Sequence, residues 1–100
     1  MNCFFLRLTG PRPDFALTLT AEERALMQAH GVYWNGLLEK GAALAFGLVL
    51  HPESPFGVCI AKGSDLQEVE RMSLEDPVTK SGLGFRWEIY PMRASVRATP

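Results

Sequence analysis

Two helix-start signals, set among four strand-like runs, constrain the fold of this chain more than any other feature. Thr20-Ala21-Glu22-Glu23 has the form of a capping box, in which Thr20 and Glu23 satisfy each other's free backbone N–H groups. Ser64-Asp65-Leu66-Gln67 has the related Ser-x-x-Gln form. The sequence therefore predicts two helices, and every other element has to fit around them.

The first predicted helix runs to Lys40, with Gly41 as a left-handed stop. Gly31 and Gly36 lie inside it, and each costs about 1 kcal/mol relative to alanine. We expect their missing side chains to let another element come close. The apolar residues of this helix recur at helical spacing and form one stripe: Leu26, Met27, Tyr33, Trp34, Leu37 and Leu38.

The second predicted helix must end by Asp76, because Pro77 disfavours helical geometry in the residue before it. Its inner face carries Leu66, Val69 and Met72 or Ser73. Residues 10–19 and 78–84 are predicted to be loops, and Pro91 is predicted to end the last strand. The four predicted strands are residues 2–9, 42–50, 56–62 and 85–90.

The resulting order is β-α-β-β-α-β, the split βαβ arrangement of the α+β, ferredoxin-like fold. Right-handed crossovers place both helices on one face of a four-stranded antiparallel sheet. The other face would expose apolar strand residues to water, so we expect a homodimer that resembles a dimeric α+β barrel. Residues 1–92 are predicted to form a single domain and residues 93–100 a C-terminal tail.

Composition excludes several classes of protein. Hydrophobic residues make up 47% of the 100 residues, which is incompatible with a disordered chain. Ten basic and eleven acidic residues leave no positive excess for nucleic acid. The longest apolar run, residues 42–50, is less than half of the roughly 20 residues that a membrane span needs. No signal peptide is recognised, and Cys3 and Cys59 fit buried free thiols, so we expect a soluble cytoplasmic protein without a membrane partner.

His30 lies near the centre of the apolar stripe, where an ionisable ring must find a partner or stay neutral. Asp76 follows 46 residues later, at the end of the second helix. If the two meet, Asp76 fixes the ring tautomer and leaves the other nitrogen free as a general base or acid. The alternative is a structural His30 held by a backbone carbonyl, with Asp76 capping the loop after its helix.

Three further residues are candidate ligand-binding groups. Tyr33 lies one turn after His30 and could aim its hydroxyl at the same cavity; otherwise it is a core aromatic residue. Arg7 or Arg86 could bind a carboxylate or phenolate; otherwise each pairs with a nearby acid such as Glu88. Trp34, by contrast, is expected to be a core or dimer contact.

No cofactor or metal site is predicted. The two histidines and two cysteines do not have the spacing of zinc ligands. Gly82-Leu83-Gly84 lacks a third glycine and follows a helix rather than a strand, so it is not a dinucleotide-binding fingerprint. We therefore expect any chemistry to use the side chains of this chain alone, on a small-molecule ligand.

The sequence also resembles the YciI-like (YCII-related) family over nearly the whole chain. The resemblance rests on an ordered set of short segments rather than on any single motif. They are Phe4-Phe5-Leu6-Arg7-Leu8, Arg12-Pro13-Asp14-Phe15, Met27-Gln28-Ala29-His30-Gly31-Val32-Tyr33-Trp34, Phe46-Gly47, Asp76-Pro77, Gly82-Leu83-Gly84-Phe85 and Tyr90-Pro91.

This resemblance implies a dimeric α+β barrel with an active site built around His30 and Asp76. Related barrels include isomerases, lyases and cofactor-free oxygenases that act on small, often aromatic, compounds. Leu48 and Val78 depart from residues common in the family, so the substrate class does not transfer. We expect a small cytoplasmic enzyme of isomerase or lyase type that uses the His30–Asp76 pair on an organic acid or phenolic compound. The alternative is a non-catalytic ligand-binding or assembly module with a structural histidine.

Overall fold

The computed structural model describes residues 2–97 and confirms the predicted order of the four strands and the two long helices. Residues 93–97 of the predicted tail form neither helix nor strand, and residues 98–100 lie outside the described residues. The elements are β1 (Cys3–Thr9), η1 (Phe15–Leu17), α1 (Ala21–Glu39), β2 (Ala43–Val49), β3 (Phe56–Lys62), α2 (Leu66–Glu75), α3 (Pro77–Lys80) and β4 (Arg86–Met92).

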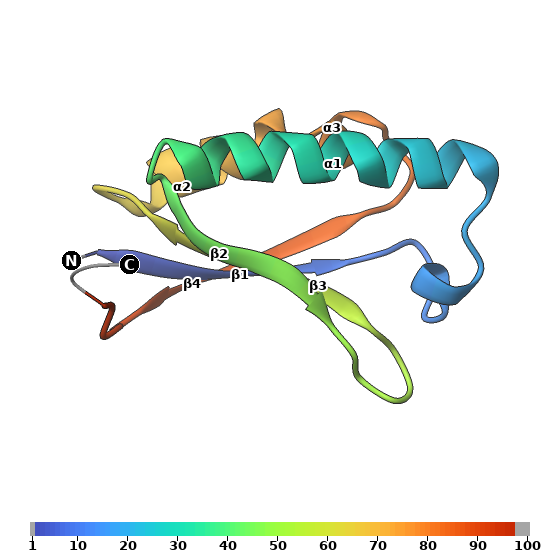
Figure 1. Ribbon diagram of the computed structural model, residues 1–100, viewed down its shortest axis with the longest axis horizontal. Coiled ribbons are helices and arrows are strands. Elements are labelled where there is room, and N and C mark those ends of the chain that lie inside the picture. The colour runs from blue at the N-terminus through green and yellow to red at the C-terminus, as the bar shows by residue number, and fades with distance from the viewer. Residues whose placement is uncertain (1, 98–100) are drawn as a thin grey trace.

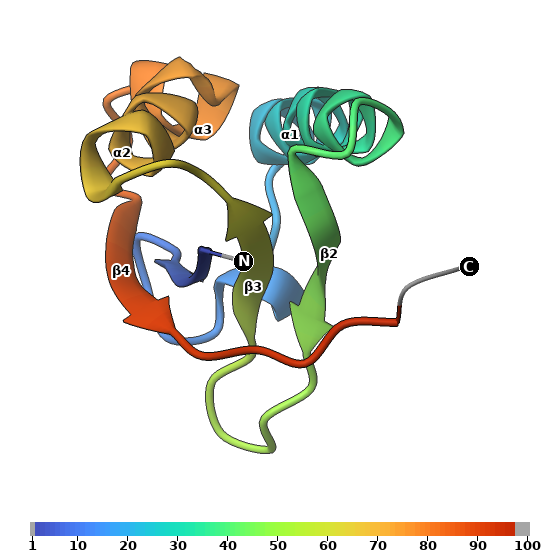
Figure 2. The same ribbon diagram turned by 90° about the vertical axis from the view of Figure 1, so that its left-hand side faces the viewer.

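The four strands form one antiparallel sheet in the order β2-β3-β1-β4. All three α-helices lie on the same side of this sheet, and no helix formed by residues 2–97 covers its other face (Figures 1 and 2). A four-stranded antiparallel sheet with helices on one face is the α+β, ferredoxin-like architecture that the sequence predicts. No described helix is long and apolar enough to cross a membrane.

The core lies between the sheet and the helices. Strand alternation directs Phe4, Leu6 and Leu8 of β1 toward the helices, and all three are buried. Trp34 of α1 and Val69 of α2 pack into one cluster with Phe4 and Leu6, and both are fully buried. This core fixes the position of α1 relative to α2, on which the site described below depends.

Helix α1 begins and ends as predicted. The Glu23 backbone N–H donates to the Thr20 hydroxyl at 3.1 Å, and the Thr20 backbone N–H donates to the Glu23 carboxylate at 2.9 Å. After the helix, Gly41 has a φ of 76°, the left-handed conformation that glycine adopts most easily. The first capping box is therefore confirmed.

The predicted start of the second helix is wrong by one residue. Asp65, not Ser64, is the N-cap of α2, and its carboxylate accepts from the Glu68 backbone N–H at 2.9 Å. The Ser64 hydroxyl and backbone N–H both donate to the Glu68 carboxylate, at 2.6 and 3.1 Å. Ser and Asp are equally good caps, so two adjacent candidates left the register open.

Two other boundaries also differ from the prediction. Residues 77–80 form the short helix α3 instead of a loop, because Asp76 caps it and Pro77 occupies its first turn, where proline needs no hydrogen-bond partner. Strand β4 continues through Pro91 to Met92. It lies at the edge of the sheet, where a proline without an N–H is tolerated.

Candidate active site

The break between α2 and α3 positions Asp76. The residue has extended backbone angles, φ −65° and ψ 133°, as expected before a proline. One carboxylate oxygen, Oδ1, accepts from the Val78 backbone N–H at 2.9 Å. The side chain is completely buried, so its second oxygen must also find donors inside the protein.

Helix α1 supplies those donors from one face. His30 Nδ1 lies 2.7 Å from Asp76 Oδ2, and Trp34 Nε1 donates to the same oxygen at 2.7 Å. His30 and Trp34 are four residues apart, which places their side chains one turn apart on the same face of the helix. His30 and Asp76, whose contact the sequence left open, therefore meet in the structure.

These contacts determine which ring nitrogen of His30 is available for chemistry. An ionised carboxylate only accepts hydrogen bonds, so Nδ1 carries the hydrogen that points at Asp76. In the neutral ring, Nε2 is then the unprotonated nitrogen. Nε2 has no hydrogen-bond partner among the described residues. It is not fully buried either, because Arg7 Nε is the one fully buried side-chain nitrogen or oxygen atom without a partner in this part of the chain. Nε2 is therefore open to a ligand or to water.

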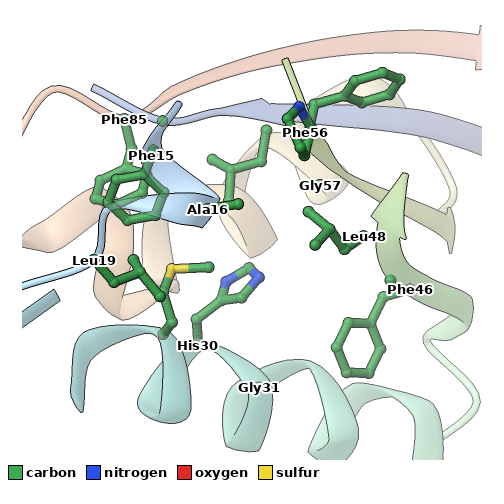
Figure 3. Close-up of a pocket in the computed structure, with 15 residues that line it drawn as sticks. Phe15, Ala16, Leu19, His30, Gly31, Phe46, Leu48, Phe56, Gly57 and Phe85 are labelled. Carbon is green, nitrogen blue, oxygen red and sulfur yellow. The ribbon is translucent and has the colours of Figure 1, made fainter. Parts of the chain in front are cut away.

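His30 borders a pocket of about 330 Å³ between α1, the loop before it and the hairpin of β2 and β3 (Figure 3). The His30 side chain is 11% exposed. Among the described residues that line the pocket, His30 is the only one with an ionisable side chain. The walls are mainly apolar and aromatic, with Phe15, Leu19, Met27, Phe46, Leu48 and Phe85 among the lining residues. Such a pocket suits a small, flat molecule that presents one polar group to the imidazole.

The loop wall of the pocket is fastened to α1 by an ion pair. The Arg12 guanidinium donates to both oxygens of Glu23, at 2.8 and 2.7 Å, and its Nε donates to the Thr18 hydroxyl at 2.8 Å. The hydrogen bonds from Arg12 lower the pKa of Glu23 to about 2. Phe15, on the same loop, packs edge-to-face on Phe85 with ring centroids 5.0 Å apart. The wall is thus fixed by charge at one side and by aromatic packing at the other.

The structure does not bring Tyr33 into this pocket. Its hydroxyl donates to the Met72 carbonyl at 2.6 Å, and Tyr33 is absent from the lining residues. Burial raises the pKa of Tyr33 to about 12, so its hydroxyl stays protonated in this contact. The helix turn after His30 points the ring toward α2 rather than toward the cavity, and Tyr33 has the packing role that was its alternative.

Arg7 and Arg86 also lie away from the pocket. Strand pairing places Arg7 opposite Glu88, and Thr9 opposite Arg86, on the sheet face that carries no helix. The Arg7 guanidinium lies over the Phe56 ring, 4.1 Å from its centroid. Neither arginine lines the pocket, because strand alternation gives the helix-covered face to Leu8 and its neighbours.

Sequence reasoning missed the role of Trp34 and the composition of the pocket walls. Trp34 is a core residue, as expected, but its indole N–H also holds Asp76. Its spacing of four residues from His30 was the available signal.

Cys59 is not a candidate nucleophile, because burial raises its pKa to about 12. Among the described residues, no group of three or more His, Cys, Asp or Glu side chains could hold a metal ion.

Comparison with known proteins places the chain in a family. No curated protein matches the sequence. A similar solved structure is 5-chloro-2-hydroxyhydroquinone dehydrochlorinase (TftG) from Burkholderia phenoliruptrix AC1100, in complex with 2,5-dihydroxybenzoquinone. The two share 22% sequence identity with a TM-score of 0.62, over 92% of this chain and 93% of the other, which shows a common fold. Residues 3–93 match the model of the YCII-related domain, and this chain therefore belongs to the YCII-related family.

Proposed function

We propose that this protein is a small enzyme in which His30 transfers a proton to and from a phenolic or quinone-like compound. The proposal rests mainly on one observation. The His30 ring borders the pocket, and its Nδ1 lies 2.7 Å from the Asp76 carboxylate. A merely structural histidine would be expected to have both nitrogens bonded within the protein, whereas Asp76 at Nδ1 is the one side-chain partner of the His30 ring among residues 2–97.

The chemistry follows from the tautomer. Neutral His30 accepts a proton at Nε2 from a hydroxyl or an acidic C–H group of the substrate, and the substrate keeps the electron pair. The resulting imidazolium is stabilised by the Asp76 carboxylate, which it faces through Nδ1–H. The substrate anion then rearranges or expels a leaving group, and Nε2 returns the proton to the product or to water. Isomerisation and elimination both fit this sequence.

The pocket favours a phenol over a carboxylic acid as the substrate. A carboxylate would lose its hydration in an apolar pocket without a lysine or arginine among the described lining residues, which is costly. A phenol or hydroxyquinone can instead stack on the aromatic walls and present one hydroxyl to His30. The dehydrochlorinase with a similar fold acts on a chlorinated hydroxyhydroquinone, which makes such compounds the first to test.

We further propose that the enzyme is a homodimer whose subunits pack through their helix-free sheet faces. On that face Phe5 lies opposite Ile60 on one side and Tyr90 on the other, which forms an apolar patch. Arg7 beside it has a buried Nε without a hydrogen-bond partner among the described residues, while Glu88 lies next to it on β4. A patch that carries both charges can complement a second copy of itself.

A charge placed in the patch tests the dimer. Ile60→Glu should give a folded monomer in sedimentation velocity, whereas Val32→Glu, on the exposed side of α1, should leave the dimer intact. A wild-type protein that sediments as a monomer at all concentrations would contradict this part of the proposal.

Two buried free cysteines, Cys3 and Cys59, are consistent with a reducing, cytoplasmic location.

The His30→Asn variant tests the catalytic proposal. The Asn amide can replace Nδ1–H as the donor to Asp76, but it offers no base at the position of Nε2. His51→Asn is the matched control, because His51 lies in the exposed β2–β3 loop and its Nδ1 accepts backbone N–H bonds that an Asn oxygen can also accept.

The assay is chloride release and solvent-deuterium uptake with chlorinated hydroxyhydroquinones and dihydroxybenzoquinones. We expect His30→Asn to lose roughly 10²- to 10⁴-fold in rate and His51→Asn to match the wild type. If the wild type binds these compounds without turnover, or if His30→Asn is fully active, the ligand-binding module is the better description.

A further inference from the structure

Helix α1 contains two glycines in its interior, Gly31 and Gly36, where almost any other residue would form a better helix. The expectation that they admit a neighbouring element is wrong. A Cβ atom built on either glycine meets nothing within 4 Å, apart from the chain neighbours and the helix backbone. Close packing therefore explains neither residue, and a different reason for their presence is needed.

The two glycines differ in what surrounds them. Gly31 lines the pocket, next to His30 and one helical turn after Met27, whereas Gly36 is not a lining residue. Figure 3 shows Gly31 on the stretch of helix that carries His30, with Phe46 facing it from β2. The open space over Gly31 is thus part of the pocket, and the open space over Gly36 is not.

From this difference we infer that Gly31 determines which ligands fit beside His30. The missing side chain leaves room for a second ring or a substituent of a molecule whose hydroxyl faces Nε2. A methyl group at position 31 would stand in that room and would exclude larger ligands before smaller ones. The inference rests on the proposed function, since it assumes that the pocket binds a phenolic compound.

Gly31→Ala is the test and Gly36→Ala its matched control. Both replace an interior helical glycine with the best helix former at a place without steric conflict, so both should raise Tm, by roughly 4–8 °C. Binding is measured by calorimetry with phenol, 4-ethylphenol and 2-naphthol. We expect Gly31→Ala to weaken the binding of 2-naphthol at least tenfold more than the binding of phenol. Gly36→Ala should bind all three compounds as tightly as the wild type does.

Each possible outcome separates this inference from the proposed function. If Gly31→Ala is stabilised and binds 2-naphthol as tightly as the wild type, the specificity role is refuted and the proposed function stands. If Gly31→Ala lowers Tm, the space over Gly31 is not open and the inference also fails. If the wild type binds none of the three phenols, the proposed substrate class is wrong and this inference falls with it.

Discussion

Replacing Asp76 with asparagine should destabilise the fold, although the two side chains have nearly the same shape. The carboxylate accepts three hydrogen bonds, at Oδ2 from His30 and Trp34 and at Oδ1 from Val78. An asparagine offers one oxygen and one NH₂ group in their place. The NH₂ group then faces an N–H donor in either orientation of the amide.

The two orientations fail differently. With NH₂ in place of Oδ1, the Val78 backbone N–H loses its acceptor. With NH₂ in place of Oδ2, the Trp34 indole N–H loses its acceptor, and His30 must move its own hydrogen to Nε2 to accept from the amide. In both cases a completely buried site keeps at least one unpaired donor, which costs about 1–3 kcal/mol. We therefore expect Asp76→Asn to lose about 2 kcal/mol of unfolding free energy.

Urea unfolding followed by tryptophan fluorescence measures this loss. Asp65→Asn is the matched control, because Asp65 is an exposed N-cap, a position where asparagine serves as well as aspartate. The control should remain within about 0.5 kcal/mol of the wild type. If Asp76→Asn is no less stable than Asp65→Asn, the three hydrogen bonds do not hold Asp76 as described.

Two further outcomes concern titration. Since the pKa of Glu23 is lowered from 4.5 to about 2 by its partner Arg12, its ion pair stabilises the folded chain above pH 4.5 and is lost as the pH falls toward 2. Glu23→Gln should therefore be less stable than the wild type at pH 7, with the gap in urea midpoints narrowing below pH 3; an equal gap at both pH values would contradict this. Burial raises the pKa of Cys59 to about 12, so its thiol should not react with a disulfide reagent at pH 8 until the protein unfolds, and rapid native-state labelling of Cys59 would show that it is accessible.

Much of the fold could be predicted because local signals agree with one another. The Thr20 capping box, the apolar stripe of α1 and the strand-like runs each have a local physical cause, and their order leaves few topologies. Boundaries were less certain where two residues of equal capping ability are adjacent, as at Ser64 and Asp65. Helix α3 was missed although Asp76-Pro77 is itself a helix-start signal, because the same proline also ends α2.

The candidate site was only partly predictable. His30 could be singled out because a polar ring on an apolar helix face needs a partner, and Asp76 because it ends the helix packed on the same sheet face. The pocket walls were not predictable, since Phe15, Phe46 and Phe85 come from three separate segments and each looks like an ordinary core residue. Arg7 and Arg86 were candidates for ligand binding, but strand alternation puts both on the sheet face away from the helices, and neither lines the pocket.

The most direct test of the account is the protonation pattern of the His30 ring. Long-range ¹H–¹⁵N NMR of the wild-type protein, at a pH where the ring is neutral, distinguishes a hydrogen on Nδ1 from one on Nε2. We predict the Nδ1–H form, with the Nε2 resonance shifting when 2,5-dihydroxybenzoquinone or a phenol is added. A neutral ring with its hydrogen on Nε2 would contradict the central claim, because Asp76 would then not orient His30 as a base.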